Sequence, residues 1–381
     1  MTQTTHHKAL VSRNADGSIL RIVTPRPSNF HAHFRKDALM RAVTKHIVKH
    51  MFYVLAMPNN GPIRNIEEAT AYHEELMRVA AQEGVRTLRK ILMTLYHTVD
   101  VTPAVIERIA KSSVVYAVKH YPPHKGATTG SGHGIPLWES RSMLEAMEDT
   151  EVPLLGHFES VYNNDGKELP HSARESYFIK EHLWRIRDRH PNLRICFEHA
   201  STEDAVAFIK ADTSGRTVGT FTPQHMLFTD DDFELYTWRN HLKCMPILKN
   251  ERNRAAVASF ATSGDFRAIL GDDTAPHLSA LKQGELDECA NGCYLPHCLA
   301  LYALAFERAN ALDGRWVRFT ATNGPKWWGL PPPDIADTVC IRAETERDMP
   351  DPTAVPEEND VVIPLGWSTA GDQLKIGLVT A

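Results

Sequence analysis

Eight short apolar segments alternate with longer segments of helical periodicity along most of this 381-residue chain. The apolar segments are rich in β-branched and aromatic residues, as is typical of buried strands. They span residues 27–34, 51–59, 87–97, 114–122, 152–160, 194–201, 217–225 and 267–277. Strands that alternate with helices usually form a parallel sheet. The pattern therefore predicts an α/β fold, either a closed (β/α)8 barrel or an open doubly wound sheet.

Helices are expected in the segments between these strands. The periodic stretches cover residues 65–84, 137–149, 172–190, 201–212 and 250–264. Two of them begin with good capping signals. Asn65 precedes an acidic first turn, and so do Ser201 and Thr202.

Polar side chains at the ends of six apolar segments favour the barrel over the open sheet. They are His31 and His33, Lys119, His157, His199, Gln224 with His225, and Asp272 with Asp273. In a (β/α)8 barrel the carboxyl ends of all strands meet at one mouth, so these groups would converge. An open sheet would spread them along an edge. The count of eight strands and the absence of a G-x-G-x-x-G fingerprint point the same way.

The converging side chains are typical ligands of a divalent ion. His31 and His33 are two residues apart, so a strand would place both on one face. The full candidate set is His31, His33, His157, His199 and Asp273. Imidazoles and a carboxylate suit zinc or a similar ion, and Asp273 could also accept a proton from metal-bound water. For a lone histidine such as His225 or His277, a hydrogen-bonded core position is the simpler interpretation.

Lys119 follows the apolar run "VVYAV", which we expect to be buried. An isolated buried ammonium is costly and tends to lose its proton. Lys119 could extend to the barrel rim, or it could be a neutral amine that has captured carbon dioxide. The resulting carbamate could bridge two cations, and two adjacent ions can support hydrolysis or closure of an amide.

Composition excludes several other classes of protein. The chain is 43% hydrophobic and 23% charged, with a formal net charge of −5. It has no long run of one charge and no apolar run long enough to span a membrane, so we expect no nucleic-acid or membrane partner. The N-terminus lacks a hydrophobic signal core, which predicts a cytoplasmic protein. In that compartment we expect six free thiols rather than disulfides or a zinc knuckle.

Ordered motifs give a more specific interpretation. They read "NFHAHFR", "AMPNNGP", "AVKHYPP", "GATTGSGHG", "LLGHFE", "CFEHAS", "TPQHMLF", "CMPILKNE", "LGDDTAPH" and "NGPKWWGLP". In this set and order the chain resembles the dihydroorotases of the amidohydrolase superfamily, specifically the compact bacterial and fungal type. The resemblance covers about residues 26–332. It implies one barrel domain over residues 1–381, with terminal extensions packed on that core.

The resemblance also implies a binuclear zinc enzyme. In this family the reaction is the reversible cyclisation of N-carbamoyl-L-aspartate to L-dihydroorotate in pyrimidine synthesis. His31, His33 and Asp273 would hold one ion. His157 and His199 would hold the other. A carboxylated Lys119 and a hydroxide would bridge the two ions, with Asp273 moving the proton.

Substrate contacts follow from the same motifs. The residues that the resemblance implies are Arg35, Asn59 and His277 at the substrate carboxylate, Thr128 and Thr129 on a mobile loop, and Met245 and Ala290 through their backbones. A homodimer is implied as well. The second carboxylate, Asp272, departs from the family pattern, which has a neutral residue there. If Asp272 pointed inward, it would raise the pKa of Asp273.

Two alternatives remain open from the sequence. A hydantoinase, dihydropyrimidinase or allantoinase would use the same metal-dependent hydrolysis of a cyclic amide on a different substrate ring. Arg35, Asn59 and His277 instead favour a substrate with an extra carboxylate. A non-catalytic barrel that supports a transcarbamoylase would belong to another class. It predicts missing ligands, whereas all six ligand positions are filled.

Overall fold

The computed structural model describes residues 9–59, 61–344, 349–370 and 372–380. Eight parallel strands form its central sheet, in the order β10-β9-β8-β7-β6-β5-β4-β3. They are β3 (Asn29–Ala32), β4 (Tyr53–Ala56), β5 (Lys90–Tyr96), β6 (Val115–His120), β7 (Leu154–Gly156), β8 (Ile195–Phe197), β9 (Thr217–Phe221) and β10 (Ala268–Leu270). Each lies inside one of the eight predicted apolar segments, so that prediction is confirmed.

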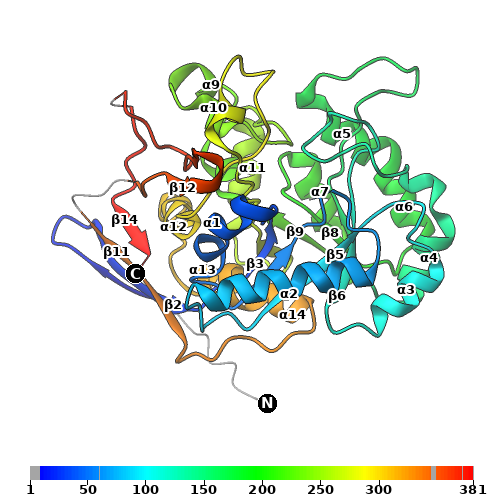
Figure 1. Cartoon of the computed structure of the whole chain (residues 1–381), viewed down its shortest axis with the longest axis horizontal. Helices are drawn as coiled ribbons and strands as arrows, with labels where there is room; N and C mark the ends of the chain where they lie inside the picture. Colours follow the sequence, from blue (N-terminus) through cyan, green and yellow to red (C-terminus); the bar gives the residue numbers. More distant parts are fainter. Residues whose placement is uncertain (1–8, 60, 345–348, 371, 381) are drawn as a thin grey trace.

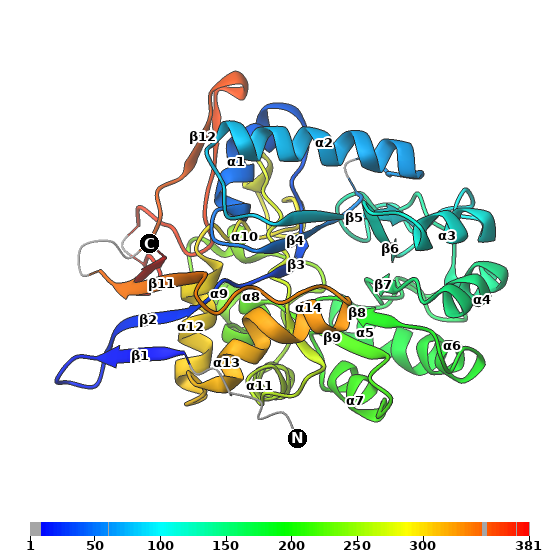
Figure 2. The ribbon, with the colours of Figure 1, turned by 90° about the horizontal axis from the view of Figure 1, so that it is seen from below.

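The sheet closes on itself into a barrel. A parallel bridge joins Ala32, at the end of β3, to Thr274, which follows β10. The first and last strands of the sheet therefore lie side by side, and the strands cross the middle of the molecule with helices around them (Figures 1 and 2). The (β/α)8 barrel is confirmed over the open sheet.

Helices cover the outside of the barrel. The longer ones are α1 (Asp37–Val48), α2 (Ile66–Gln82), α3 (Pro103–Ala110), α4 (Arg141–Thr150), α7 (Glu203–Ala211), α11 (Glu251–Ala261) and α12 (Cys298–Arg308). The shorter ones are α5 (Arg174–Phe178), α6 (Trp184–Arg189), α8 (Pro223–Leu227), α9 (Asp232–Leu235), α10 (Arg239–Leu242), α13 (Gly314–Val317) and α14 (Asn323–Trp327). A π-helical turn over Ile179–Leu183 joins α5 to α6. None of the helices in the described part of the chain is long and apolar enough to cross a membrane.

The predicted helix starts are confirmed at two caps. The Asn65 side chain accepts a hydrogen bond from the Glu68 amide at 2.8 Å, and Thr202 accepts one from the Ala205 amide at 3.2 Å. Each cap satisfies an amide that has no partner within its own helix. Because α7 begins just after His199, its cap also fixes the chain beside the barrel mouth.

A second sheet lies beside the barrel and contains strands from both ends of the chain. It has the order β1 (Leu10–Arg13), β2 (Ile19–Pro25), β11 (Thr338–Ala343) and β14 (Leu378–Thr380). All its pairs are antiparallel. A small hairpin of β12 (Thr353–Val355) and β13 (Asp360–Val362) lies close by in sequence. The prediction of one domain over residues 1–381 stays a prediction.

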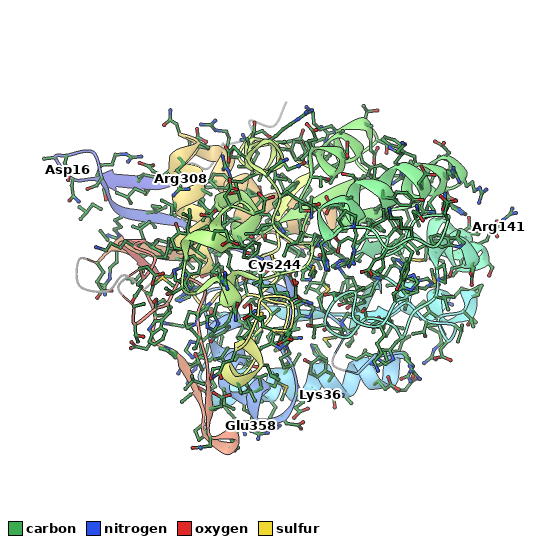
Figure 3. The ribbon with its side chains drawn as sticks, turned by 90° about the horizontal axis from the view of Figure 1, so that it is seen from above. Asp16, Lys36, Arg141, Cys244, Arg308 and Glu358 are labelled. Carbon is green, nitrogen blue, oxygen red and sulfur yellow. The ribbon has the colours of Figure 1, made fainter. Side chains whose placement is uncertain are left out.

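The cysteines are free thiols, as predicted, and five of the six are buried. Figure 3 shows Cys244 near the middle of the molecule, whereas Asp16 and Arg141 lie at opposite ends. Cys298 begins α12, which packs as a largely apolar helix. These sulfur atoms therefore belong to the packed interior of the fold.

Candidate metal and substrate site

Two histidines and an aspartate bring three ligand atoms together at the barrel mouth. His31 Nε2 and His33 Nε2 each lie 3.1 Å from Asp273 Oδ1, and the two nitrogens are 3.3 Å apart. Ligands about 2.0–2.1 Å from a tetrahedral zinc ion would be about 3.3 Å from one another. The described residues thus hold these three donors at the spacing that one ion requires.

Two members of this triad, His33 and Asp273, have the protonation state that a metal ligand needs. Burial lowers the pKa of His33 to about 4. Burial alone would raise the pKa of Asp273, but His31 and His33 hold it well below its usual value. Burial also lowers the pKa of His31, yet Glu198 and Asp273 outweigh it and the net shift is upward. A bound cation would displace the proton that these two carboxylates favour on His31.

Lys119, His157 and His199 supply the rest of the predicted ligand set. The His199 ring lies 4.6 Å from the His157 ring and 5.1 Å from the His31 ring, measured between centroids. Lys119 is fully buried on β6, and its Nζ has no hydrogen-bond partner among the described residues. Burial lowers its pKa, which favours a neutral amine. An unpartnered amine at this place fits the predicted carbamate.

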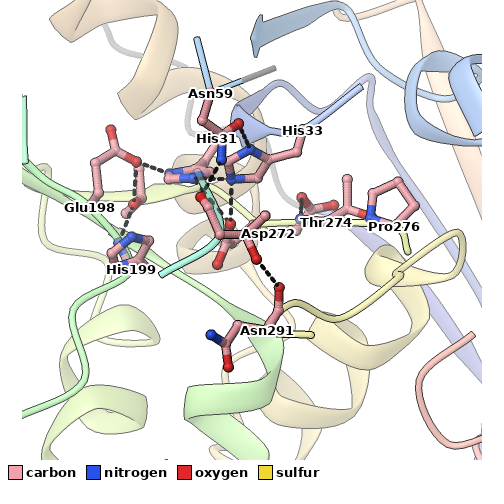
Figure 4. Close-up of polar contacts among 12 residues, drawn as sticks. His31, His33, Asn59, Glu198, His199, Asp272, Thr274, Pro276 and Asn291 are labelled. Atoms are coloured by element: carbon pink, nitrogen blue, oxygen red, sulfur yellow. Dashed lines mark hydrogen bonds and ion pairs between the residues drawn. The ribbon is translucent and has the colours of Figure 1, made fainter. Parts of the chain in front are cut away.

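Further side chains orient the histidines, and the sequence interpretation missed two of them. Glu198 Oε2 contacts His31 Nδ1 and accepts a hydrogen bond from Thr220 Oγ1 (Figure 4). Glu159 Oε2 lies 2.6 Å from His157 Nε2. Such partners fix the tautomer and the angle of a metal-binding imidazole. The sequence could have pointed to these two glutamates by their positions, because Glu198 directly precedes His199 and Glu159 follows His157 by two residues.

The backbone is strained at three site residues. Arg35, His199 and Asp273 have φ angles of 65°, 40° and 54°. Left-handed backbone is uncommon for residues other than glycine and is concentrated at functional sites. Here each residue lies just after a barrel strand, where the chain turns sharply to present its side chain.

Arg35, His277 and Asn291 form the other end of the site. Arg35 Nε donates to the Pro276 carbonyl at 2.8 Å, and its Nη2 lies 3.0 Å from His277 Nε2. The same His277 nitrogen lies 2.9 Å from the Asn291 carbonyl. Burial holds the pKa of His277 well below its usual value, so the ring is neutral. In a neutral ring, His277 Nε2 can accept a hydrogen bond from Arg35 or donate one to the Asn291 carbonyl, but not both. A ligand carboxylate would give Arg35 a better acceptor than this nitrogen.

The loop with Thr128 and Thr129 lies over this pocket. Thr129 Oγ1 donates to the Asn291 carbonyl at 3.1 Å, and Asn59 Nδ2 donates to the Thr129 carbonyl at 3.0 Å. Asn59 Oδ1 also lies 2.7 Å from His33 Nδ1, so Asn59 connects this loop to the triad. The cavity is about 20 Å³, which is room for a water molecule. A larger ligand therefore requires part of the lining to move.

The remaining predicted residues differ in their placement. Met245 lines the cavity, whereas Ala290 is not among the lining residues and its neighbours Asn291 and Gly292 are. Tyr121 also lines it and was missed by the sequence interpretation, although it follows Lys119 by two residues. Its hydroxyl is buried without a hydrogen-bond partner among the described residues.

Asp272 does not have the effect on Asp273 that an inward carboxylate was expected to have. Its Oδ1 accepts a hydrogen bond from the Thr274 amide at 2.9 Å, and its side chain interacts with Cys298 at the start of α12. Burial raises the pKa of Asp272 to about 6. The pKa of Asp273 stays well below its usual value, as a metal ligand requires.

Comparison with known proteins gives the family. The dihydroorotase of Halorhodospira halophila is 39% identical over 357 residues, which are 93% of this chain and 97% of that protein. The chain belongs to the dihydroorotase family. The dihydroorotase of Picosynechococcus is 37% identical over the same shares of the two chains. No family model matches the chain.

Solved structures agree with the assignment to the dihydroorotase family. The dihydroorotase of Saccharomyces cerevisiae, in complex with 5-fluoroorotic acid, superimposes with a TM-score of 0.81 at 25% identity and covers 95% of this chain and 98% of that chain. An L-hydantoinase from Arthrobacter aurescens shares the fold, with a TM-score of 0.65 at 15% identity over 87% of this chain and 78% of that one. The barrel is thus the fold of the amidohydrolase superfamily.

Proposed function

We propose that this protein is a dihydroorotase that interconverts N-carbamoyl-L-aspartate and L-dihydroorotate in pyrimidine synthesis. The observation that carries the proposal is that the His31, His33 and Asp273 triad lines the same cavity as Arg35, which His277 contacts from outside the lining. A metal-binding cluster and a carboxylate-binding group thus line one cavity. Membership of the dihydroorotase family supports this substrate.

The ligand set fits two divalent ions, which we propose to be zinc. His31, His33 and Asp273 would hold one ion, His157 and His199 the other, and a carboxylated Lys119 would join them. When bound, such ions lower the pKa of water and polarise an amide carbonyl. Glu198 and Glu159 keep His31 and His157 at the angles that ligation needs.

Asp273 is suited to move the proton. Its pKa lies well below the usual value, so it is a carboxylate before the reaction begins. In the hydrolytic direction Asp273 takes a proton from the attacking water and delivers it to the leaving ring nitrogen. In the synthetic direction it removes the proton from the same nitrogen and returns it to the departing oxygen.

Arg35, Asn59 and His277 bind the substrate carboxylate in this proposal. The Arg35 guanidinium can hold a carboxylate with two parallel hydrogen bonds. Thr128 and Thr129 close over the bound ring, and backbone groups of Met245 and of residues 290–292 contact it from the side. Loop closure keeps bulk water away from the reacting amide.

An assay of the purified protein tests the proposal. We expect it to hydrolyse L-dihydroorotate and to cyclise N-carbamoyl-L-aspartate, with loss of both activities on chelation and recovery with zinc. Hydantoin and dihydrouracil serve as matched rings without a carboxylate, and we expect far lower kcat/KM for both. If zinc-loaded protein supplied with bicarbonate turns over neither carboxylate-bearing substrate, the assignment is wrong. Faster turnover of hydantoin would favour the hydantoinase alternative.

We also propose that the protein is a homodimer. Its substrates are small molecules, and it needs no nucleic-acid partner. The support is the resemblance of its motifs to the dihydroorotase family. Sedimentation analysis of the zinc-loaded protein should give twice the mass of one chain. A monomer at all concentrations tested would contradict the dimer and leave the enzyme assignment unchanged.

A further inference from the structure

Lys282 is a buried lysine whose ammonium group is used entirely on backbone carbonyls. It ends a short 3-10 turn, Ser279–Lys282, and is 5% exposed. Its Nζ donates to the carbonyls of Ala290 at 2.8 Å, Gly292 at 2.9 Å and Lys243 at 3.4 Å. These three bonds use all three N–H groups of an ammonium. No carboxylate in the described part of the chain forms an ion pair with Lys282.

Two of the three carbonyls that Lys282 binds, those of Ala290 and Gly292, belong to the segment that contacts the ligand cavity. We call residues 289–292 the substrate loop. Its backbone is fixed further where the Ala290 amide donates to the Leu281 carbonyl at 2.8 Å and the Gly292 amide donates to the Lys243 carbonyl at 2.9 Å. The loop therefore curves around one ammonium group, and Lys282 determines its path.

Asn291 lies between the two loop residues that Lys282 holds. Its carbonyl accepts from Thr129 Oγ1 and lies 2.9 Å from His277 Nε2. A shift of the Ala290 or Gly292 carbonyl would move Asn291, and with it both the Thr129 contact and the His277 ring. Lys282 thus acts on the ligand cavity through the loop, although it does not line the cavity itself.

Burial lowers the pKa of Lys282, as it does that of Lys119, but Lys282 has three carbonyl acceptors and these favour its charged form. In that form the charge of Lys282 adds to the effect on the loop. The pKa of His277 lies well below its usual value, first because of burial and then because of the positive charges of Arg35 and Lys282. Two cations therefore lie near the carboxylate-binding end of the cavity. In a buried site a positive charge acts over a longer distance than it does at the surface, so an anionic ligand is favoured.

We propose that Lys282 is a positioning residue that shapes the substrate loop and favours ligands that carry a carboxylate. The inference rests on the proposed function, because it concerns the same cavity. It assigns a role to a residue that does not line the cavity and that acts through the backbone of Ala290 and Gly292.

The test compares Lys282→Met with wild-type enzyme. Methionine keeps much of the length of lysine and removes the charge and the three donors. We expect KM for dihydroorotate to rise about 10- to 100-fold while kcat changes less than about 3-fold, as for lost hydrogen bonds to a charged group. The Kd of 5-fluoroorotate should rise by the same factor, and metal content should be unchanged.

Two further variants separate this role from a general loss of structure. Lys249→Met is the matched control, since Lys249 is equally buried but its Nζ donates to the Ile247 carbonyl at 2.8 Å, outside the substrate loop. We expect its KM to change less than about 3-fold. Lys282→Gln keeps two N–H donors without the charge, so its KM should lie between wild type and Lys282→Met. It also provides the measurement if the methionine variant does not fold.

Unchanged KM and Kd in folded Lys282 variants would overturn the inference. A fall in kcat and metal content at constant KM would overturn it as well, because that pattern belongs to a purely structural residue. If the wild-type enzyme does not turn over dihydroorotate, the proposed function fails. The 5-fluoroorotate Kd of wild type and variants then still tests the role of Lys282 on its own.

Discussion

At the scale of single residues, the His31 imidazole shows how this site is held in place. His31 comes from β3, its Nδ1 contacts Glu198 after β8, and its Nε2 faces Asp273 after β10. Three separate segments thus fix one ring. Because the ring is buried, any change in its partners leaves a polar atom without a hydrogen bond.

Replacement of Glu198 should therefore weaken metal binding. In Glu198→Gln the charge beside His31 Nδ1 is lost, and we expect metal affinity to fall about 10- to 100-fold. Competition with a chelator of known affinity measures the change. Glu203→Gln is the matched control, because it makes the same change at a glutamate of α7 whose carboxylate pairs with Arg252, at 2.8 Å. Equal affinity in Glu198→Gln and wild type would show that Glu198 does not orient the ligand.

Lys119→Ala should lose both metal and activity. The buried Nζ has no hydrogen-bond partner among the described residues and lies 5.3 Å from the centre of the Tyr121 ring, so its removal should act mainly on the two metal ions that it is proposed to join. We expect fewer than two ions per chain by elemental analysis and a fall in kcat of at least about 100-fold. Lys90→Ala, at the start of β5, is the control and should keep normal metal content. Wild-type stoichiometry in Lys119→Ala would contradict the carbamate.

Sequence reasoning found the residues with distinctive chemistry and missed those that act by position. His31, His33, His157 and His199 stand out because imidazoles are unusual at strand ends. Tyr121 and Glu198 do not stand out, since a tyrosine or a glutamate at such a place has many ordinary roles. Only the closed barrel brings Glu198 to His31, 167 positions earlier in the chain.

At the scale of elements, the central strands were predictable and the second sheet was not. Most barrel strands are largely apolar runs, because both faces of the sheet are covered. By contrast β1 is mostly exposed, and β2 pairs with β11 more than 300 residues later in the chain. Such a sheet is hard to predict from the sequence, because its strands have only a weak apolar pattern and pair with strands far away in the chain.

The contact between α5 and α7 gives a prediction about pH. Glu175 on α5 accepts hydrogen bonds from Ser201 Oγ at 2.9 Å and Thr202 Oγ1 at 2.6 Å, and burial raises its pKa to about 7. The folded state thus keeps a proton that the unfolded state loses above about pH 4.5. Stability from this group is present at low pH and is lost as pH rises from about 4.5 through about 7.

Glu175→Gln tests this pH effect. The wild-type protein should lose on the order of 3 kcal/mol of unfolding free energy from Glu175 across that window, and the variant should lack this contribution. Urea unfolding at pH 5, 6, 7 and 8 measures the difference between the two proteins. Glu234→Gln, in the short surface helix α9, should follow the wild-type curve. Parallel curves for Glu175→Gln and wild type would refute the raised pKa.

At the scale of the whole molecule, metal binding by these ligands would stabilise the folded barrel. The proposed ligands lie at the ends of five different strands, and the bridge between Ala32 and Thr274 closes the barrel beside them. An ion at this place would bind the folded chain and not the unfolded one. Binding that favours only the folded state stabilises it by mass action.

Removal of metal should therefore lower the melting temperature. With free zinc at about 100 times its Kd, the stabilisation would be about 2.7 kcal/mol per independent ion. Calorimetry of the chelated and zinc-loaded protein measures the shift, and Lys119→Ala should show a smaller one. An identical Tm with and without metal would mean that the described ligands do not bind an ion in the folded state.

The contacts that hold the metal ligands and those that hold the substrate loop involve different residues. Glu198 and Glu159 orient the imidazoles, while Lys282 and Lys243 hold the backbone of residues 289–292. For protein engineering, this separation means that the loop and its lysines form a unit that can be exchanged. Exchange of this segment should alter how tightly a ligand ring is held and leave the residues that hold the metal ions in place.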